Sequence, residues 1–227
     1  MLLIYSSTAA CASSALLSPH ETSGSPLLPV TIPVRKRLFD CFFSLLVVGL
    51  VLSWFIPLVA LLIKLESRGP VFFKQLRTGK QGTSFYCLKF RSMMLNDEAD
   101  SIQASRVDSR ITKVGAFLRR TSLDELPQFI NVLRGEMSIV GPRPHMLHHT
   151  KEYSKAVHNF MDRHLVLPGI TGLAQVTGCR GEISDPEAIA KRVSTDIHYI
   201  QTMSGLLDLK IIWLTVRLVL RPGNDTF

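Results

Sequence analysis

The sequence predicts an α+β protein that is mainly helical and attached to a membrane. Three segments support this fold class. Residues 41–63 form one apolar run without a charged residue. Residues 71–90 have the pattern of two short strands around a Gly-rich turn, which predicts a small β-hairpin. Residues 206–221 have the apolar periodicity of an amphipathic helix.

The length of 227 residues and these segments predict three parts. Residues 1–33 are expected to be a variable, disordered leader, and they lack the basic start of a secretory signal. Residues 34–66 are predicted to be a membrane anchor. Residues 67–222 are predicted to form one unit with its own core, because the chain is too short for two ordinary domains beside an anchor.

The apolar run carries the membrane prediction. Its 23 residues would form a helix about 34 Å long, against a hydrocarbon core of about 30 Å. Pro57 cannot donate a hydrogen bond to the carbonyl of Ser53, so a kink is expected there, and the Ser53 hydroxyl is available to satisfy the freed backbone. Two alternatives follow: a bent helix that leaves by the face it entered, or an ordinary single-pass helix.

Charged residues at the start of the run predict an anchor in the headgroup layer. Asp40 would cost about 2.5–3.5 kcal/mol near a bilayer centre. At the interface it can pair with Lys36 or Arg37, one helical turn earlier. The sequence therefore predicts an ion-paired cluster of Lys36, Arg37 and Asp40 at the membrane surface.

The last segment, residues 206–221, is expected to lie in the plane of an anionic membrane. Lys210, Arg217 and Arg221 fall within about 40° of one another on a helical wheel, and most of the remaining circumference is apolar. Basic residues beside an apolar face favour anionic lipid surfaces. The alternative is a core helix with a solvated basic edge.

The net charge of +8 predicts an anionic partner. Nucleic acid, an acidic membrane surface and a phosphorylated substrate all satisfy that requirement, but no nucleic-acid-binding motif accompanies the charge. The cysteines have neither CxxC spacing nor a disulfide framework, which indicates a reducing compartment. They are Cys11, Cys41, Cys87 and Cys179.

The predicted hairpin concentrates positive charge. Its GKQGTS turn lacks the upstream Gly of a Walker A phosphate loop, and a strand follows it instead of a helix, so that class of site is excluded. Arg77, Lys89 and Arg91 lie in or directly beside the strands. They predict either a diphosphate site or a solvated basic face.

Adjacent carboxylates, Asp124 and Glu125, stand in the segment richest in reactive groups. Pro127 suits the first position of a helix over residues 127–133, which would place both carboxylates in the turn before it. The alternative is a capping box between Ser122 and Glu125. Side chains of adjacent residues diverge by about 100° or more, so two different tasks are expected for the pair.

Flanking residues predict an anionic ligand beside this pair. Arg119 and Arg120 precede it, and a helix amino terminus attracts phosphate. Residues 141–144, GPRP, would hold Arg143 on a stiff turn, either to grip phosphate or as a structural corner. Gly-rich loops surround Gln175. A metal site is not expected at His145, His148 and His149, because they lack HExxH spacing and a carboxylate or Cys to complete the ligand set.

These segments, in this order, resemble the monotopic phosphoglycosyl transferases, bacterial polyprenyl-phosphate sugar-phosphate transferases that begin glycan assembly. The resemblance covers nearly all of the chain from Val34 onward. RHLVLPGITG, RGE and the PH after GPR are most similar to the exopolysaccharide branch, often with UDP-glucose or UDP-galactose. Leu173, Thr177 and Cys179 depart from that branch, which weakens any transfer of sugar preference. The matching stretches are KRLFD, GPVFFKQLRTGKQGTSFYCLKFRSM, DSRITKVGAFLRRTSLDELPQFINVLRGEMSIVGPRPH, PGITGLAQVTGCRGE and DLKIIWLTV.

The resemblance implies a topology and a set of partners. The first helix would be a re-entrant hairpin broken near Pro57, with interfacial helices around an active site on the cytoplasmic face of the bacterial inner membrane. Residues 67–222 would be the catalytic bacterial sugar transferase domain. The implied partners are a UDP-sugar, a polyprenyl phosphate lipid and the membrane, with downstream glycosyltransferases acting on the product. Nucleic acid is not expected, and the sequence does not indicate an oligomeric state.

The resemblance also implies residue roles. Asp124 would attack the β-phosphorus of the nucleotide sugar and release UMP, leaving a sugar-phosphoryl aspartate that the lipid phosphate displaces. Mg²⁺, bound partly by Asp124, would offset negative charge, and Glu125 would assist the metal or act on the incoming phosphate. The residues expected to bind nucleotide, phosphate and sugar are Arg77, Lys89, Arg91, Asp108, Arg110, Arg119, Arg120, Arg143, Gln175 and Arg180.

A competing hypothesis is a non-catalytic adaptor that uses its basic helices at a membrane surface. That hypothesis predicts that Asp124→Asn leaves activity and partner binding unchanged.

Overall fold

The computed structural model describes residues 30–94, 108–179 and 185–220, and within these ranges the protein is mostly helical with two small sheets. This agrees with the predicted α+β class. The helices are α1 Val34–Leu46, α2 Ser53–Glu66, α3 Lys113–Arg120, α4 Gln128–Leu133, α5 Leu147–Ala156, α6 Leu173–Val176, α7 Pro186–Thr202 and α8 Gly205–Leu220. The strands are β1 Phe72–Thr78, β2 Ser84–Phe90, β3 Ser138–Val140 and β4 Gly169–Thr171. Four short helical turns complete the order: η1 Val47–Leu52, η2 Lys80–Gly82, η3 Leu123–Glu125 and η4 Phe160–Leu165.

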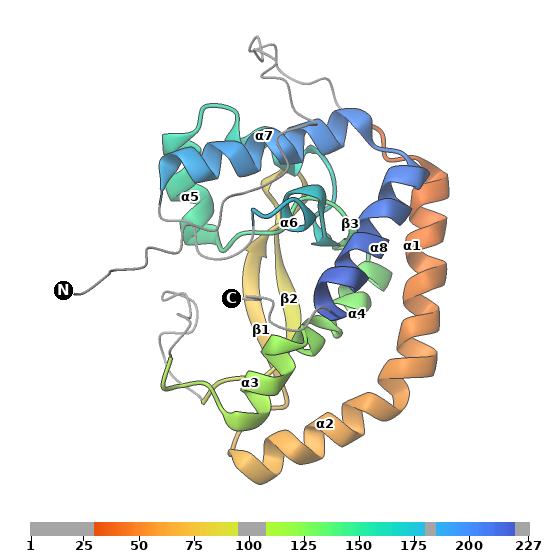
Figure 1. The fold of residues 1–227 in the computed structure, drawn as a ribbon, viewed down its shortest axis with the longest axis vertical. Helices are drawn as coiled ribbons and strands as arrows, with labels where there is room; N and C mark the ends of the chain where they lie inside the picture. Colours follow the sequence, from red (N-terminus) through yellow and green to blue (C-terminus); the bar gives the residue numbers. More distant parts are fainter. Residues whose placement is uncertain (1–29, 95–107, 180–184, 221–227) are drawn as a thin grey trace, which may run out of the picture.

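A bent helix frames one side of the molecule. Figure 1 shows α1 along one edge and α2 crossing below the hairpin at a steep angle to it. The irregular turn between them is η1, a π-helical segment in which the Ser53 N–H donates to the carbonyl of Val48. Pro57 lies inside α2, so the irregular segment ends about a turn before the predicted position of the break. A π turn takes up an extra residue and keeps the backbone hydrogen-bonded ahead of a proline that cannot donate.

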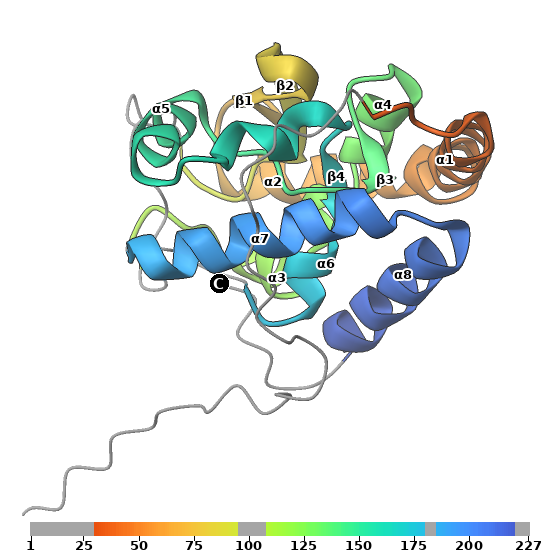
Figure 2. The same cartoon turned by 90° about the horizontal axis from the view of Figure 1, so that it is seen from above.

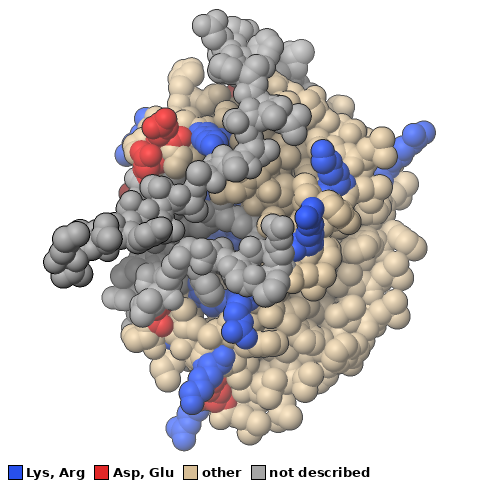
Figure 3. Space-filling model, in the orientation of Figure 1, with Lys and Arg blue, Asp and Glu red and all other residues tan. Residues whose placement is uncertain are grey.

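The bent helix leaves much of its apolar surface uncovered. Val34–Glu66 is, within the described residues, the one helix long and apolar enough to cross a membrane by length and composition. Leu38, Leu50, Leu61 and Leu65 are among its exposed large side chains. Figure 3 shows a wide, mostly uncharged surface on the side where Figure 1 places α1 and α2. This surface agrees with the predicted apolar anchor.

The charged residues at the start of α1 are bonded differently from the prediction. Asp40 is buried and accepts hydrogen bonds from Ser138 Oγ (2.7 Å) and the Ile139 N–H (3.2 Å). Arg37 donates to the carbonyl of Val132 (2.7 Å). The expected pairing of Asp40 with Lys36 or Arg37 at the headgroups is therefore wrong. These side chains face the rest of the protein. There, backbone groups of β3 and α4 that lack a partner within their own element bond to Asp40 and Arg37, in place of the neighbouring side chain on the helix.

The predicted hairpin is present. β1 and β2 are antiparallel, with Phe72 opposite Phe90. Both strands begin and end close to the predicted residues. Asn131 of α4 fastens the helix to this sheet, because its side chain accepts from the Leu88 N–H (3.0 Å) and donates to the Tyr86 carbonyl (2.8 Å). β2 and α4 therefore fix the segment between α3 and α4 in space.

A second, parallel sheet was not predicted. Ser138 of β3 pairs with Gly169 of β4, and Val140 pairs with Thr171. Each strand has three residues, too few to produce a readable alternation. In Figure 2, α7 crosses beside this sheet and α8 turns away from it. The main core lies here and includes Val132, Met137, Val140 and Tyr199.

The last helix packs along one side only. Asp208 and Ile211 are its buried residues, whereas Leu206, Trp213 and Leu220 are more than half exposed. Arg217 lies over the Trp213 ring at 5.5 Å. A core helix would bury its apolar side chains, whereas Leu206, Trp213 and Leu220 are open to solvent, so the alternative of a core helix with a basic edge does not fit. Arg221, the third predicted basic residue, lies outside the described residues.

Candidate active site

A pocket of about 1020 Å³ opens beside the hairpin. Its walls come from β1, β2, η3, the turn after β3, and parts of α1, α5 and α8. Both carboxylates and seven of the ten predicted binding residues line it. The seven are Arg77, Lys89, Arg91, Arg110, Arg119, Arg143 and Gln175.

The carboxylates lie in the turn before a helix, as predicted. Asp124 and Glu125 belong to η3, and α4 begins directly after Pro127. The capping-box alternative is wrong, because Ser122 makes no side-chain cap and Glu125 is bonded to other residues. Ser122 has a left-handed backbone (φ 55°), whereas an N-cap normally has an extended one. The sharp turn at Ser122 instead directs the carboxylates into the pocket.

Glu125 holds two cations. Lys89 Nζ donates to Oε1 at 2.7 Å. Arg143 donates to both oxygens, with Nη2 2.6 Å from Oε1 and Nη1 3.2 Å from Oε2. Burial alone would raise the pKa of Glu125, but the charges and hydrogen bonds of Arg143 and Lys89 outweigh it and lower that pKa well below its usual range. Glu125 is therefore a fixed anion that organises the basic side of the pocket.

Asp124 has the opposite environment. Burial is the largest influence, and it raises the pKa of Asp124 to about 6, with a further upward contribution from the charge of Glu125. Lys89, Arg119 and Arg143 act against this shift. Within the described residues no group donates a hydrogen bond to its carboxylate. Two adjacent carboxylates thus differ sharply in basicity.

Two predicted phosphate ligands are bonded to the protein backbone. Arg91 donates to the carbonyls of Ser67 (2.8 Å) and Arg68 (2.6 Å), just beyond the end of α2. Arg77 donates to the carbonyl of Pro144 (2.6 Å). Both arginines line the pocket, yet these hydrogen bonds hold their guanidinium groups against backbone carbonyls of the protein itself. The carbonyls after α2 attract Arg91 because they have no intrahelical donor.

The remaining predicted ligands divide into three groups. Arg119 and Gln175 line the pocket, and Arg110 does so while bonded to Asp108 (Nη2 to Oδ2, 2.7 Å). Asp108 and Arg120 are not among the described lining residues. Arg180 lies outside the described residues. The structure therefore does not bring all ten residues to one wall.

Sequence reasoning missed an apolar wall of the same pocket. Phe43, Val47 and Val51 come from α1 and η1, and Ile212 and Val216 come from α8. The two helices are far apart in sequence, so no local pattern could show that they face one space. The pocket thus combines a charged side with an apolar side contributed by the bent helix and the last helix.

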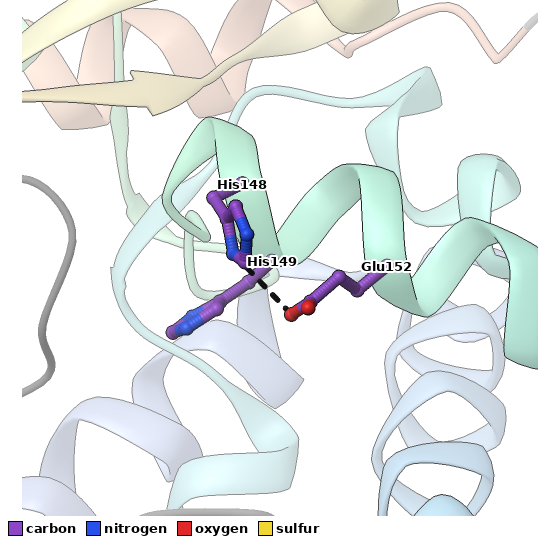
Figure 4. A group of neighbouring side chains, drawn as sticks. All are labelled: His148, His149 and Glu152. Carbon is purple, nitrogen blue, oxygen red and sulfur yellow. Dashed lines mark ion pairs between the residues drawn. The ribbon is translucent and has the colours of Figure 1, made fainter.

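A second group of side chains could hold a metal ion. His148, His149 and Glu152 of α5 bring their ligand atoms within 4.8 Å of one another. Figure 4 shows the three side chains, with the ion pair between His148 and Glu152 dashed. His148 Nδ1 and Glu152 Oε2 are 3.3 Å apart. The sequence reading missed Glu152, which a helix places one turn from His148. His148 and Glu152 are exposed and form an ordinary i, i+4 pair, and His149 alone of the three lines the pocket.

Comparison with known families accounts for most of the chain. The model for bacterial sugar transferases matches residues 32–222. The chain belongs to the bacterial sugar transferase family. This confirms the family inferred from the KRLFD, LRRTSLDELP and GPRPH stretches.

Individual bacterial sugar transferases are also similar. A Klebsiella pneumoniae protein named UDP-glucose:undecaprenyl-phosphate glucose-1-phosphate transferase is 49% identical over 205 residues, 87% of this chain and 44% of its own length. Exopolysaccharide production protein PSS of Rhizobium leguminosarum bv. phaseoli is 46% identical over 196 residues, 84% of this chain and 98% of its own.

An Aeromonas hydrophila UDP-N-acetylgalactosamine-undecaprenyl-phosphate N-acetylgalactosaminephosphotransferase is 40% identical over 206 residues, which cover 88% of this chain and 47% of the relative. The chain therefore spans less than half the length of two of these bacterial sugar transferases and nearly all of the third.

Proposed function

We propose that this protein transfers a sugar-1-phosphate from a UDP-sugar to undecaprenyl phosphate and releases UMP, in the first membrane step of exopolysaccharide, capsule or O-antigen synthesis. The observation that carries the proposal is the pair Asp124 and Glu125, adjacent in sequence and opposite in basicity, at the junction of a cationic and an apolar pocket wall. The names of the relatives make glucose the first sugar to test and N-acetylgalactosamine the next. The family resemblance adds galactose.

In the first step, an Asp124 oxygen forms a bond to the β-phosphorus of the UDP-sugar. The bond from that phosphorus to the bridging oxygen breaks, and UMP leaves with the oxygen. A nucleophile must be ionised and poorly solvated to react, and a buried carboxylate beside cations meets both conditions. Lys89, Arg119 and Arg143 are placed to stabilise the phosphate charges, because each influences the Asp124 carboxylate.

In the second step, an oxygen of the lipid phosphate forms a bond to the same phosphorus and expels the Asp124 carboxylate. The product is a sugar joined to the lipid by a diphosphate. The acceptor needs a site that is polar at its head and apolar along its tail. Phe43, Val47 and Val216 supply apolar surface in the pocket that contains Asp124. Glu125 serves this chemistry by holding Lys89 and Arg143 in place.

Mg²⁺ is the metal that the family resemblance implies, and the residues fit it. The Asp124 carboxylate accepts no hydrogen bond from the described part of the chain, whereas both Glu125 oxygens are bound by cations. Mg²⁺ is usually held by one or two carboxylates together with substrate phosphates. Asp124 would hold the ion, which when bound would neutralise phosphate charge.

The bent helix supports a re-entrant anchor in the bacterial inner membrane, with the active site on the cytoplasmic face. Its exposed apolar surface and the steep angle between α1 and α2 favour a segment that enters and leaves by one face. Labelling of tags at both termini from the periplasm of intact cells tests this topology. Neither tag should react, and reaction of either one contradicts it.

The decisive test measures UMP before any lipid is added. Purified protein with Mg²⁺ and UDP-glucose should release about one UMP per active site and then stop, and undecaprenyl phosphate should restart the release. Asp124→Asn should release none. If the wild type releases no UMP with a broad panel of UDP-sugars, the transferase proposal fails. The non-catalytic adaptor would then be favoured if Asp124→Asn also leaves membrane and partner binding unchanged.

A further inference from the structure

The turn after β3 is held at four consecutive backbone carbonyls by donors from elsewhere in the chain. Two donors are arginine side chains and two are backbone N–H groups. The pairs are Gly169 N to Pro142 O (2.9 Å), Arg163 Nη2 to Arg143 O (2.8 Å), Arg77 Nη1 to Pro144 O (2.6 Å) and Thr78 N to His145 O (3.0 Å). Because donors from three elements, β4, η4 and β1, bind these four carbonyls, the backbone of this turn has little freedom to move.

Arg163 of η4 makes one of these four bonds and is itself bonded to two other side chains. Its Nε and Nη2 donate to Oδ2 of Asp196 on α7, at 3.0 and 2.6 Å. The two side chains are 1% and 2% exposed. Nη1 lies 2.8 Å from Nδ1 of His145. A guanidinium group can only donate, so this ring nitrogen accepts, in keeping with a His145 pKa that burial and Arg163 lower well below its usual range.

Arg143 is the residue of this turn whose side chain grips Glu125. A two-bond grip depends on the position of the backbone that carries it, because hydrogen bonds weaken steeply with distance and angle. Arg163 and Asp196 are not among the described residues that line the pocket. The hydrogen bond from Arg163 to the Arg143 carbonyl joins this pair to the residue that grips Glu125. Burial of an ion pair carries a desolvation cost, so stability alone does not explain why a buried pair lies at this point.

We propose that the Asp196–Arg163 pair positions Arg143 for its grip on Glu125. Arg77 performs the same task from the hairpin side of the turn, which gives it a positioning role in place of the predicted phosphate contact. The proposal rests on the transferase function above for its kinetic consequences. Asp196, Arg163 and Arg77 are positioning residues, and Arg143 is the residue through which they act.

A double-mutant cycle tests this coupling. Asp196→Asn should lower kcat for UMP release about 10- to 100-fold, because a small displacement of a positioned group has effects of that order. In an Arg143→Ala background the same change should cost less than about 3-fold, since the grip is already absent. Asp196→Glu should recover part of the loss. Equal losses in both backgrounds would overturn the proposal.

Ile189→Ala provides the matched control. Ile189 is buried on α7 with Asp196 but belongs to a separate apolar cluster. The Ile189→Ala variant should destabilise the helix and lower kcat by the same small factor in the wild-type and Arg143→Ala backgrounds. If Asp196→Asn does not fold, Arg77→Gln enters the same cycle, because it releases the Pro144 carbonyl from the other side. An additive loss for Arg77→Gln then counts against the proposal.

A readout without catalysis separates this inference from the transferase function. With ¹³C-labelled glutamate and Glu125→Gln for assignment, the pKa of Glu125 should rise in Asp196→Asn as it does in Arg143→Ala. An unchanged pKa in Asp196→Asn would overturn the positioning role even in an active enzyme. If the wild type releases no UMP, the transferase function fails while this titration still decides the role of Asp196.

Discussion

Lys36 of α1 and Asp208 of α8 form an ion pair across 172 positions of sequence, with Nζ and Oδ2 2.7 Å apart. The Tyr199 hydroxyl of α7 lies 2.7 Å from the other Asp208 oxygen. One carboxylate thus joins the first helix of the anchor to the last two helices. Both charged side chains are largely removed from water, at 10% and 7% exposure. The joint therefore depends on both partners being present.

Lys36→Met should lower the free energy of unfolding by about 3 kcal/mol, because it leaves the Asp208 charge buried with, among the described residues, only Tyr199 as a side-chain partner. The measurement is thermal or denaturant unfolding in detergent. Lys64→Met, on exposed α2, should change it by less than about 0.5 kcal/mol. Equal effects of the two changes would show that the pair does not hold the joint.

UMP release should depend on pH through Asp124. Burial raises the pKa of Asp124 to about 6, so the ionised nucleophile is lost as pH falls through 6, about two units above an ordinary aspartate. The rate of the UMP burst should therefore halve near pH 6 at low Mg²⁺ concentration. A bound cation should move this midpoint lower. A profile that stays flat down to pH 4.5 would contradict the raised pKa.

Asp124→Asn should abolish UMP release and increase stability at pH 7. A carboxyl whose folded pKa lies above its unfolded value destabilises the fold once pH exceeds both, and the neutral amide removes that penalty. We expect a gain on the order of 1–3 kcal/mol at pH 7, declining as pH falls below 6. Unfolding curves at pH 5 and 7 provide the check. A loss of stability at pH 7 would show that the charge is favourably solvated.

Glu125→Gln should have the opposite effect on stability. The pKa of Glu125 is lowered, so its ionised form stabilises the folded state at neutral pH. The amide leaves Lys89 and Arg143 without their shared carboxylate and should lower the free energy of unfolding by about 2–4 kcal/mol. The two variants compared at pH 7 should therefore shift the unfolding midpoint in opposite directions. Shifts of the same sign would contradict the assigned environments.

Asn131→Leu should loosen α4 from the hairpin. The amide is fully buried and serves the backbone of Leu88 and Tyr86, so an apolar side chain leaves an N–H and a carbonyl without partners. A loss of about 2–4 kcal/mol is expected. Amide hydrogen exchange of Leu88 should accelerate more than that of Val193 on α7. Equal acceleration would indicate a global effect instead of a local one.

Local sequence was sufficient for elements whose signal lies within a few residues. The alternation around the GKQGTS turn predicted the hairpin, and Pro127 marked the start of α4 and so placed Asp124 and Glu125 ahead of it. Both outcomes depend on backbone chemistry, namely turn residues and a proline that suits a first helical position. The uncharged run before the hairpin likewise predicted the long apolar helix.

Only the tertiary structure determined which partner each charge has. Asp40 was expected to pair with Lys36 one turn away, but it binds Ser138 and Ile139, and Lys36 binds Asp208. The same holds for the apolar pocket wall that α1 shares with α8. Helical spacing shows which residues are neighbours on one helix, but it does not show what a folded neighbour presents to them.

By itself, the sequence determined the family, the helix-rich α+β class and the position of the carboxylate pair. Burial and the convergence of distant cations then made Asp124 the basic member of that pair and Glu125 the fixed anion, because pKa values respond to surroundings in space and not to order along the chain.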